Sequence, residues 1–182
     1  HHERFSFDEF AARLPELRER AASMMLYLDP FTDSITVELR RYRDHPPGER
    51  LSPWQWRLRN GVWNNLAPRW AFNVSRLVRS SGLRSVLFGL GNRLAARALT
   101  TLVRGRATLP TAQQIRYPAV ANNARYTFSI WAFPEARYVE CLKAYFEFSR
   151  EHYERTGYRT NLLSVGYRIH ADQQSLFSYS YE

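Results

Sequence analysis

The sequence predicts an α+β fold: a mainly antiparallel sheet made from two split strand–helix–strand units, with helices on one face and a helical insert. Three observations predict it. Stretches near both ends of the chain alternate between apolar and polar side chains, as strands do. Apolar residues at three- and four-residue spacing adjoin these stretches, as in amphipathic helices. Residues 44–123 differ in composition and are expected to be an insert within one domain of residues 1–182.

The N-terminal part begins with a capping box. Ser6 is placed to accept a hydrogen bond from the backbone N–H of Glu9, and Glu9 to reach back, so a helix is predicted to start there. Two strands follow around the turn-rich segment PFTDS, because ITVELRRYR alternates apolar and polar side chains. The predicted order is helix, strand, strand. A strand preceding His1 is expected to have been lost.

The C-terminal part repeats this order. Residues 124–133, ARYTFSIWAF, alternate as a strand, and Pro134 is suited to the first turn of a helix. Gly157 is placed to end that helix, since glycine is the usual left-handed cap. NLLSVGYRIH and SLFSYSY are then predicted to form a hairpin. The chain stops inside this hairpin at Glu182, where a cut with further strands beyond is expected.

The insert carries the positive charge of the chain. The net charge is +9, yet thirteen arginines lie from Arg50 to Arg125 and no Asp or Glu lies between Glu49 and Glu135. Arginine favours carboxylates, phosphates and aromatic faces. The insert is predicted to form two or three helices whose tryptophans, interleaved with arginines, pack as a helical core. An anionic membrane surface or an acidic protein is the next interpretation, and nucleic acid is the least favoured partner.

Composition excludes several classes of protein. Cys141 is the only cysteine, so an internal disulfide framework is excluded, and no two-cysteine cluster or His-x-x-x-His pair offers a metal site. The motif GLGN lacks the spacing of a phosphate loop. No apolar run approaches the roughly 20 residues of a membrane-spanning helix. The chain is therefore expected to be soluble and cytoplasmic, with a membrane-peripheral position left open.

Strand alternation predicts one polar sheet face. In residues 161–170, Leu163, Val165, Tyr167 and Ile169 are expected to face the helices, which leaves the alternate residues on the opposite face. A polar face carrying an aromatic ring, hydroxyls and charges fits a lid over a polar ligand, and a solvated face fits equally well. The candidates for substrate contact are Arg168, Trp131, Ser129 and Ser164, followed by His170, Arg40 and Glu38. No catalytic residue is singled out.

Several segments resemble the FAD-linked oxidase superfamily, also called the vanillyl-alcohol oxidase or PCMH-type superfamily. FSIWAFPE, TGYRTNLLSVGYRI, Asp172 and SLFSYSY resemble its cap domain, in a branch near the aldonolactone and sterol-reductase-type members. MMLYLDPFTDSITVELRRY resembles the entry to the same cap, and SPWQWRLRN resembles its helical excursion. The resemblance covers most of the chain, although each motif alone is unspecific and their order carries the likeness.

The resemblance implies a function. In this superfamily a separate domain binds FAD, and a cap built on an antiparallel sheet covers the flavin and supplies substrate contacts. A hydride moves from a C–H bond next to oxygen to the flavin, or a C=C bond is reduced. The FAD-binding domain is expected upstream of His1, so this chain alone should neither hold FAD nor turn over a small hydroxylated substrate. The competing hypothesis is a non-catalytic interaction module whose arginine-rich insert docks on an anionic membrane or protein surface.

Overall fold

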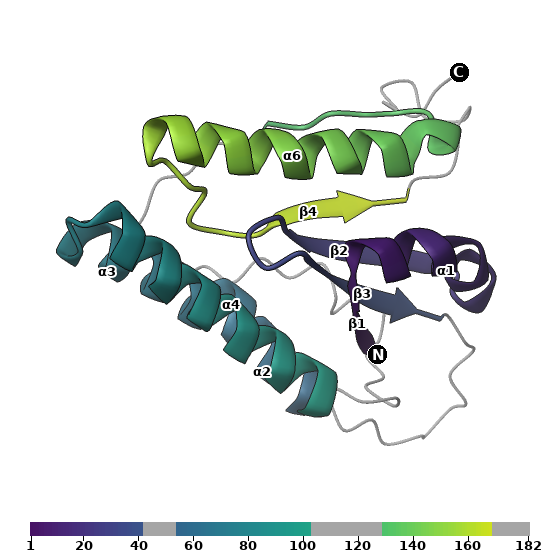
Figure 1. The fold of residues 1–182 in the computed structure, drawn as a ribbon. Helices are drawn as coiled ribbons and strands as arrows, with labels where there is room; N and C mark the ends of the chain where they lie inside the picture. The colour runs from purple at the N-terminus through teal and green to yellow at the C-terminus, as the bar shows by residue number, and fades with distance from the viewer. Residues whose placement is uncertain (42–53, 103–128, 169–182) are drawn as a thin grey trace, which may run out of the picture.

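A four-stranded antiparallel sheet forms the centre of the molecule (Figure 1). The computed structural model describes residues 1–41, 54–102 and 129–168. The sheet order is β1-β3-β2-β4, and every neighbouring pair is antiparallel. The strands are β1 (His2–Ser6), β2 (Ser23–Asp29), β3 (Ser34–Arg40) and β4 (Ser164–Tyr167). The predicted α+β class with an antiparallel sheet is confirmed.

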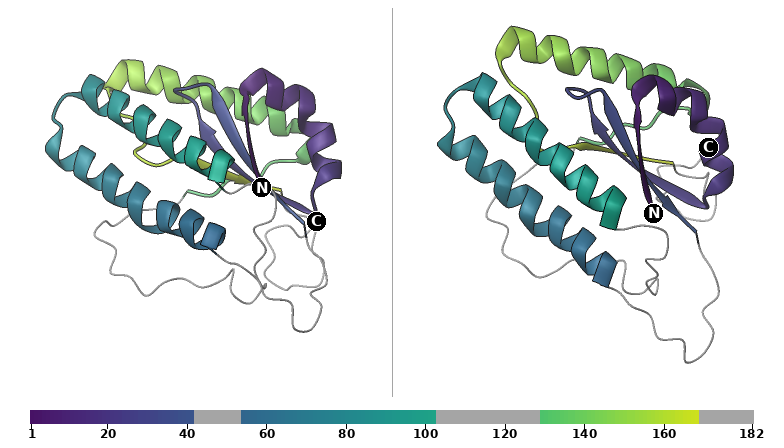
Figure 2. Two further views of the ribbon diagram at one scale, coloured as in Figure 1. Left: turned by 90° about the horizontal axis from the view of Figure 1, so that it is seen from below. Right: turned by 60° about the horizontal axis from the view of Figure 1, so that its bottom comes forward.

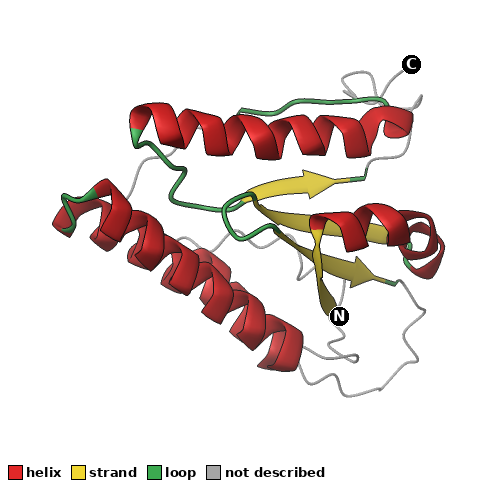
Figure 3. Cartoon of the chain, in the orientation of Figure 1, coloured by secondary structure: helices red, strands yellow, loops and turns green. Residues whose placement is uncertain are grey.

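Helices cover the sheet on both sides (Figures 2 and 3). On one face lie α1 (Phe7–Arg20) and α6 (Tyr138–Thr156), the latter preceded by a short 3₁₀ turn (Glu135–Arg137). The insert lies against the other face. It comprises α2 (Trp54–Gly61), a π-helical stretch (Val62–Leu66), α3 (Ala67–Leu77) and α4 (Ser81–Leu102). The chain from α2 to α3 runs beside α4, so the insert is a helical hairpin laid on the sheet.

The first unit has its leading strand. Residues 2–6 form β1, which pairs with β3 in a register that places Phe5 opposite Ile35. The expectation that this strand lies before His1 is therefore wrong. The segment HERFS shows no apolar alternation, because the buried residue on one face of the strand is polar. This residue, His2, forms a hydrogen bond with the Glu38 carboxylate. Since β3 lies between β1 and β2, the unit is a split β-α-β arrangement.

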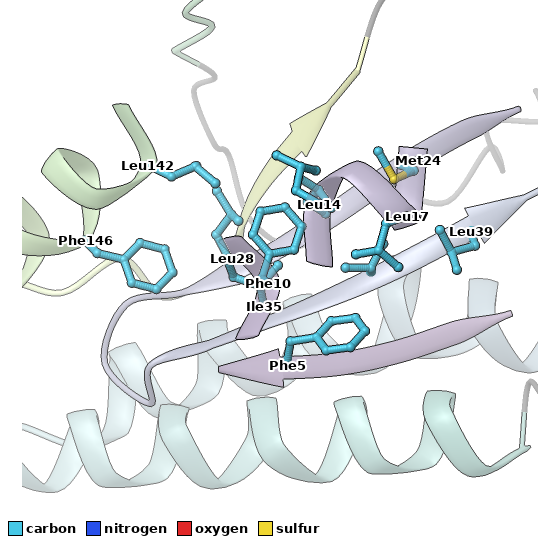
Figure 4. Close-up of a cluster of buried hydrophobic side chains, with 12 residues drawn as sticks. Phe5, Phe10, Leu14, Leu17, Met24, Leu28, Ile35, Leu39, Leu142 and Phe146 are labelled. Atoms are coloured by element: carbon cyan, nitrogen blue, oxygen red, sulfur yellow. The ribbon is translucent and has the colours of Figure 1, made fainter. Parts of the chain in front are cut away.

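The main core lies between the sheet and the helices α1 and α6 (Figure 4). The capping box is present: the Ser6 hydroxyl accepts from the Glu9 N–H, and the Glu9 carboxylate accepts from the Ser6 N–H. Once started there, α1 directs its apolar stripe at the sheet. The buried residues are Phe5, Phe10, Leu14, Leu17, Met24, Leu26, Leu28, Ile35, Val37, Leu39, Leu142 and Phe146.

The expected facing of the strand after α6 is wrong by one residue. In β4, Gly166 lies opposite Leu26 and Ser164 opposite Leu28, so Gly166 and Ser164 face α6. Val165 and Tyr167 point to the other face and are 41% and 55% exposed. The reason is steric. Because Gly166 has no side chain, Tyr138 of α6 lies directly against the strand at this point.

The segment before α6 also departs from the prediction. Residues 129–133, the described end of the expected strand 124–133, form no strand, and Ile130 is 84% exposed. Residues 124–128 and the expected second hairpin arm lie outside the described part of the chain. The limits of α6 agree with the sequence: Pro134 precedes the 3₁₀ turn, and Gly157 ends the helix with φ of +67° while its N–H donates to the Tyr153 carbonyl.

The contact between Gly166 and Tyr138 gives a testable prediction. A methyl group at Gly166 would collide with the buried Tyr138 hydroxyl, which has no hydrogen-bond partner among the described residues. Gly166→Ala is expected to lower the free energy of unfolding by about 1–3 kcal/mol, as overpacking does. Tyr138→Phe removes the obstructing oxygen, so the double variant should recover most of that loss. Urea denaturation of the four proteins measures this, and simple additivity of the two single effects would contradict it.

Candidate functional site

A buried carboxylate lies at the centre of the sheet face beneath the insert. Glu38 is 1% exposed, because it projects from the middle strand β3 on the side opposite Ile35 and Val37. Its Oε2 lies 2.9 Å from the Tyr27 hydroxyl, which donates to it, and 3.1 Å from His2 Nε2. Arg59 Nε donates to the same oxygen at 2.8 Å, and Arg40 Nε donates to Oε1 at 2.7 Å. We call these five residues the Glu38 network.

Aromatic rings and a thioether enclose the network. The Tyr27 ring stacks on Trp63 with centroids 4.5 Å apart and planes 9° from parallel. The Arg59 guanidinium lies 5.3 Å from the centroid of the Trp56 ring and donates to the Tyr27 hydroxyl at 2.9 Å. Arg40 and Arg59 both direct an N–H at the Met25 sulfur. Since Arg59, Trp56 and Trp63 belong to the insert, the network fastens the insert to the sheet.

The electrostatics keep the network charged. Burial by itself would raise the pKa of Glu38, but the hydrogen bond from His2 and the charges of Arg59 and Arg40 outweigh it and hold that pKa well below its usual range. Burial, with the nearby Glu38 charge, raises the pKa of Tyr27. Glu38 is therefore ionised and Tyr27 neutral at neutral pH. A carboxylate with so low a pKa is a poor general base, so its role is to fix the groups that donate to it.

A second buried ion pair joins the first unit to the C-terminal unit and contacts the insert. Asp29, at the end of β2, lies 3.4 Å from Arg159 through Oδ1, and its Oδ2 accepts from Asn92 of α4 at 3.3 Å. Arg159 also donates to the Ser85 carbonyl at 2.9 Å and lies 4.1 Å over the Phe31 ring. Burial of the guanidinium lowers the pKa of Arg159, and the negative charge of Asp29 partly offsets this effect. The pair holds α4 against the turn between β2 and β3.

An open hollow lies at the same turn. It has a volume of about 580 Å³ and is bordered by Phe31, Asp33, Arg93, Lys143 and Arg150, among others. Arg150 pairs with Asp33 at 2.7 Å and also donates to the Pro30 carbonyl at 2.8 Å. The hollow is open, and charged side chains make up much of its lining, whereas a small-molecule site is mostly apolar. It therefore does not meet the usual description of a ligand site.

The residues predicted to contact substrate do not come together on one face. Glu38 and Arg40 lie on the insert side. Ser164 faces α6, where its hydroxyl forms a hydrogen bond with the Tyr145 hydroxyl. Arg168 lies 2.8 Å from Glu135, and Glu135 also pairs with Arg18 of α1. The prediction that all of them share one sheet face is wrong, because β4 has the opposite facing.

The remaining candidates lie apart from these. Trp131 and Ser129 lie in the exposed segment before α6 and bond each other through Nε1 and the hydroxyl at 2.8 Å. His170 lies outside the described residues. Contact of any of these residues with a substrate stays a prediction.

Three members of the Glu38 network were not among the predicted site residues. Tyr27 could have been found from alternation, since it shares its face with Met25 and lies beside Thr36 of β3. His2 could not, because a five-residue strand with mixed polarity gives no signal. Arg59 is one of thirteen arginines from Arg50 to Arg125, and no sequence pattern distinguishes it from the others.

Comparison of the chain with protein-family models, with curated proteins and with solved structures found no match. The resemblance to the FAD-linked oxidase superfamily therefore remains a prediction. Within the described ranges, His, Cys, Asp and Glu side chains do not gather into a group that could hold a metal ion. None of the described helices has the length and apolar character needed to cross a membrane.

Proposed function

We propose that this chain is the cap, or substrate-binding portion, of an FAD-dependent oxidoreductase that acts on a small hydroxylated substrate, with hydride transfer to or from the flavin. The observation that carries the proposal is the antiparallel pairing of β2 with β4. Each of these strands follows the helix of its unit, α1 or α6, and both helices lie on the same face. The resemblance implies a cap built on an antiparallel sheet, and the two units joined edge to edge form such a sheet.

Arg40 is the proposed substrate contact among the described residues. It lies at the end of β3, and its side chain is 28% exposed while its Nε and a terminal nitrogen are engaged by Glu38 and the Met25 sulfur. Glu38 thus positions a guanidinium at the border of the insert. A guanidinium held in this way can donate to a hydroxyl or carboxylate oxygen of a ligand. Glu38 itself is too deeply buried to touch substrate and serves as a positioning residue.

The described residues do not fit FAD. The dinucleotide needs backbone N–H groups presented by a glycine-rich turn. The glycines at 61, 82, 89 and 91 lie in helices, Gly157 caps α6, and Gly166 lies in β4 against Tyr138. We therefore assign FAD, within this proposal, to an FAD-binding domain outside residues 1–182, and we derive no chemical step for the flavin from this chain.

The test uses the protein made from the whole reading frame that encodes this segment. Flavin absorption bands in the visible range, absent from the 182-residue chain alone, are expected. A folded, colourless full-length protein that stays colourless when supplied with FAD would overturn the proposal. In the coloured protein, Arg40→Gln should raise KM by roughly tenfold to a hundredfold, the value of one charged hydrogen bond, without changing the flavin spectrum. Arg41→Gln is the matched control, because Arg41 donates to the Arg20 carbonyl instead.

A further inference from the structure

The outward face of α4 carries an apolar stripe. Leu83, Val86, Leu90 and Leu94 are spaced by three or four residues, so they share one side of the helix, and each is at least 49% exposed. The opposite side of α4 is the buried one. It carries Phe88, which packs on Ala71 and Val74 of α3, and also Asn92, which bonds Asp29 of the sheet. The stripe therefore points away from the rest of the described fold.

Helix α3 extends this apolar surface. Trp70 reaches across to α4, where its Nε1 donates to the Leu87 carbonyl at 3.3 Å and its ring lies against Gly91. Leu66, the last residue of the π-helical stretch before α3, and Leu77, the last residue of α3, are 65% and 75% exposed. Isolated exposed apolar residues are ordinary, but a continuous row along two neighbouring helices indicates a surface that binds something. We call the seven residues Leu66, Trp70, Leu77, Leu83, Val86, Leu90 and Leu94 the hairpin stripe.

The charge around the hairpin stripe is of one sign. Arg97 lies on the same side of α4 as Leu90 and Leu94, and Arg93 lies at the edge of that side, where it also borders the hollow at the turn between β2 and β3. Arg69 and Arg76 are exposed on α3. None of these four arginines has a carboxylate partner among the described residues, whereas Arg40, Arg59 and Arg159 do. Residues 50–134 contain no acid at all, so no carboxylate in the described part of the insert neutralises them.

We infer that the α3–α4 hairpin docks on an anionic lipid surface, with the hairpin stripe in the boundary between headgroups and acyl chains and the arginines at the phosphates. Leucines and a tryptophan on one face, with unpaired arginines beside them, are the composition of a helix that lies in the membrane interface. Trp70 suits that boundary because its ring is both apolar and polar. Since the described helices are unsuited to crossing a bilayer, the hairpin lies on the surface rather than through it. This inference rests on the insert alone and is independent of the flavin proposal.

An anionic bilayer fits better than the other charged partners. A nucleic acid would meet the arginines but leave the leucines against its polar backbone. Recognition of single strands uses several aromatic rings, whereas Trp70 is the one aromatic residue of the hairpin stripe. A second copy of the chain would bring the same unpaired arginines into contact with each other, and like charges repel.

The experiment is co-sedimentation of the 182-residue chain with vesicles. Binding is expected to vesicles that combine phosphatidylcholine and phosphatidylglycerol, and little binding to phosphatidylcholine alone. Raising the salt from about 0.1 M to about 1 M shortens the screening length from about 10 Å to about 3 Å, so it should release most of the protein. Replacing Arg93 and Arg97 together with Gln should weaken partitioning about thirtyfold. Replacing Leu90 and Leu94 together with Ser should weaken it about tenfold.

Matched controls lie on α6, across the sheet. Phe148→Ser removes an exposed apolar residue and Arg155→Gln an exposed arginine, and neither should change binding. All substituted positions are exposed, and far-UV circular dichroism confirms that the helices remain. Failure of the wild type to sediment with anionic vesicles would overturn the inference, as would equal binding to both kinds of vesicle. It would also be overturned if the chain self-associated without lipid and the leucine variants abolished that association.

Discussion

Glu38→Gln is expected to lower the free energy of unfolding by about 3–5 kcal/mol, the loss usually seen when one partner of a buried ion pair is removed. The reason is the charge left behind. Arg59 has a side chain only 12% exposed, and Glu38 is the only carboxylate it contacts among the described residues. The glutamine keeps the size of the side chain but not its charge, so the guanidinium stays buried and unbalanced. Urea denaturation monitored by circular dichroism measures the change.

Two further variants separate charge from shape. Glu16→Gln breaks exposed pairs with Arg13 and Arg20 on α1 and should leave the unfolding midpoint nearly unchanged, because exposed pairs contribute little. Arg59→Gln combined with Glu38→Gln removes both buried charges, so the double variant should lose less stability than the two single losses added together. Full additivity would show that Arg59 and Glu38 do not depend on each other, contrary to the geometry.

The acid limb of the stability curve provides an independent readout for the same residue. The pKa of Glu38 is lower in the folded chain than its ordinary value of 4.5, so ionised Glu38 stabilises the fold above pH 4.5. That contribution is lost as the pH falls below 4.5 toward the folded pKa, because the unfolded chain then binds a proton that the folded chain does not. Wild type should therefore lose stability more steeply below pH 4.5 than Glu38→Gln does, and parallel slopes would contradict the assignment.

Phe10→Ala is expected to be about as damaging as Glu38→Gln, by about 3–5 kcal/mol, for a different physical reason. Phe10 is 0% exposed and lies between α1 and the sheet, beside Leu28 and Ile35 (Figure 4). Removing its ring leaves a cavity that the surrounding strands cannot close, since they are held in register by backbone hydrogen bonds. Small domains have a total stability of about 5–15 kcal/mol, so the variant should lie close to the unfolding threshold at room temperature.

Phe148→Ala is the control for Phe10→Ala. It removes the same atoms from the exposed side of α6, where Phe148 is 59% exposed, and should change the unfolding free energy far less. Thermal unfolding of the three proteins gives the comparison. Equal effects for the two phenylalanines would mean that α1 is not packed on the sheet as the structure has it.

Local signals in the sequence predicted local structure well. The capping box at Ser6 and Glu9 located the start of α1 because both partners lie within one turn. Gly157 located the end of α6 because a positive φ favours glycine. The alternation of Ile35, Val37 and Leu39 gave the facing of β3 because these residues bury one complete side of the strand.

Features that depend on distant partners were missed. Alternation in β4 predicted two faces but not which of them contacts α6. Gly166, opposite Leu26, faces α6 because it has no side chain and leaves room for Tyr138. The Glu38 network joins His2, near the beginning of the chain, with Tyr27 and with Arg59 of the insert. Only the fold brings these three elements together, so sequence reasoning identified Glu38 and Arg40 but not the residues that neutralise and enclose them.

The sheet order also governs how quickly the molecule can assemble. The strands β1, β2 and β3 come from the first 40 residues, so their pairing requires only short loops to close. The pairing of β2 with β4 brings together Tyr27 and Val165, which are 138 positions apart (165 − 27). Each doubling of a loop adds only about 0.6 kcal/mol of closure entropy, so this distance is a small thermodynamic burden. The same separation has a larger effect on the folding rate, because pairings between residues that are distant in sequence form slowly. We therefore expect the N-terminal unit to fold first. Its β2 edge then stays unpaired until α6 and β4 fold onto it.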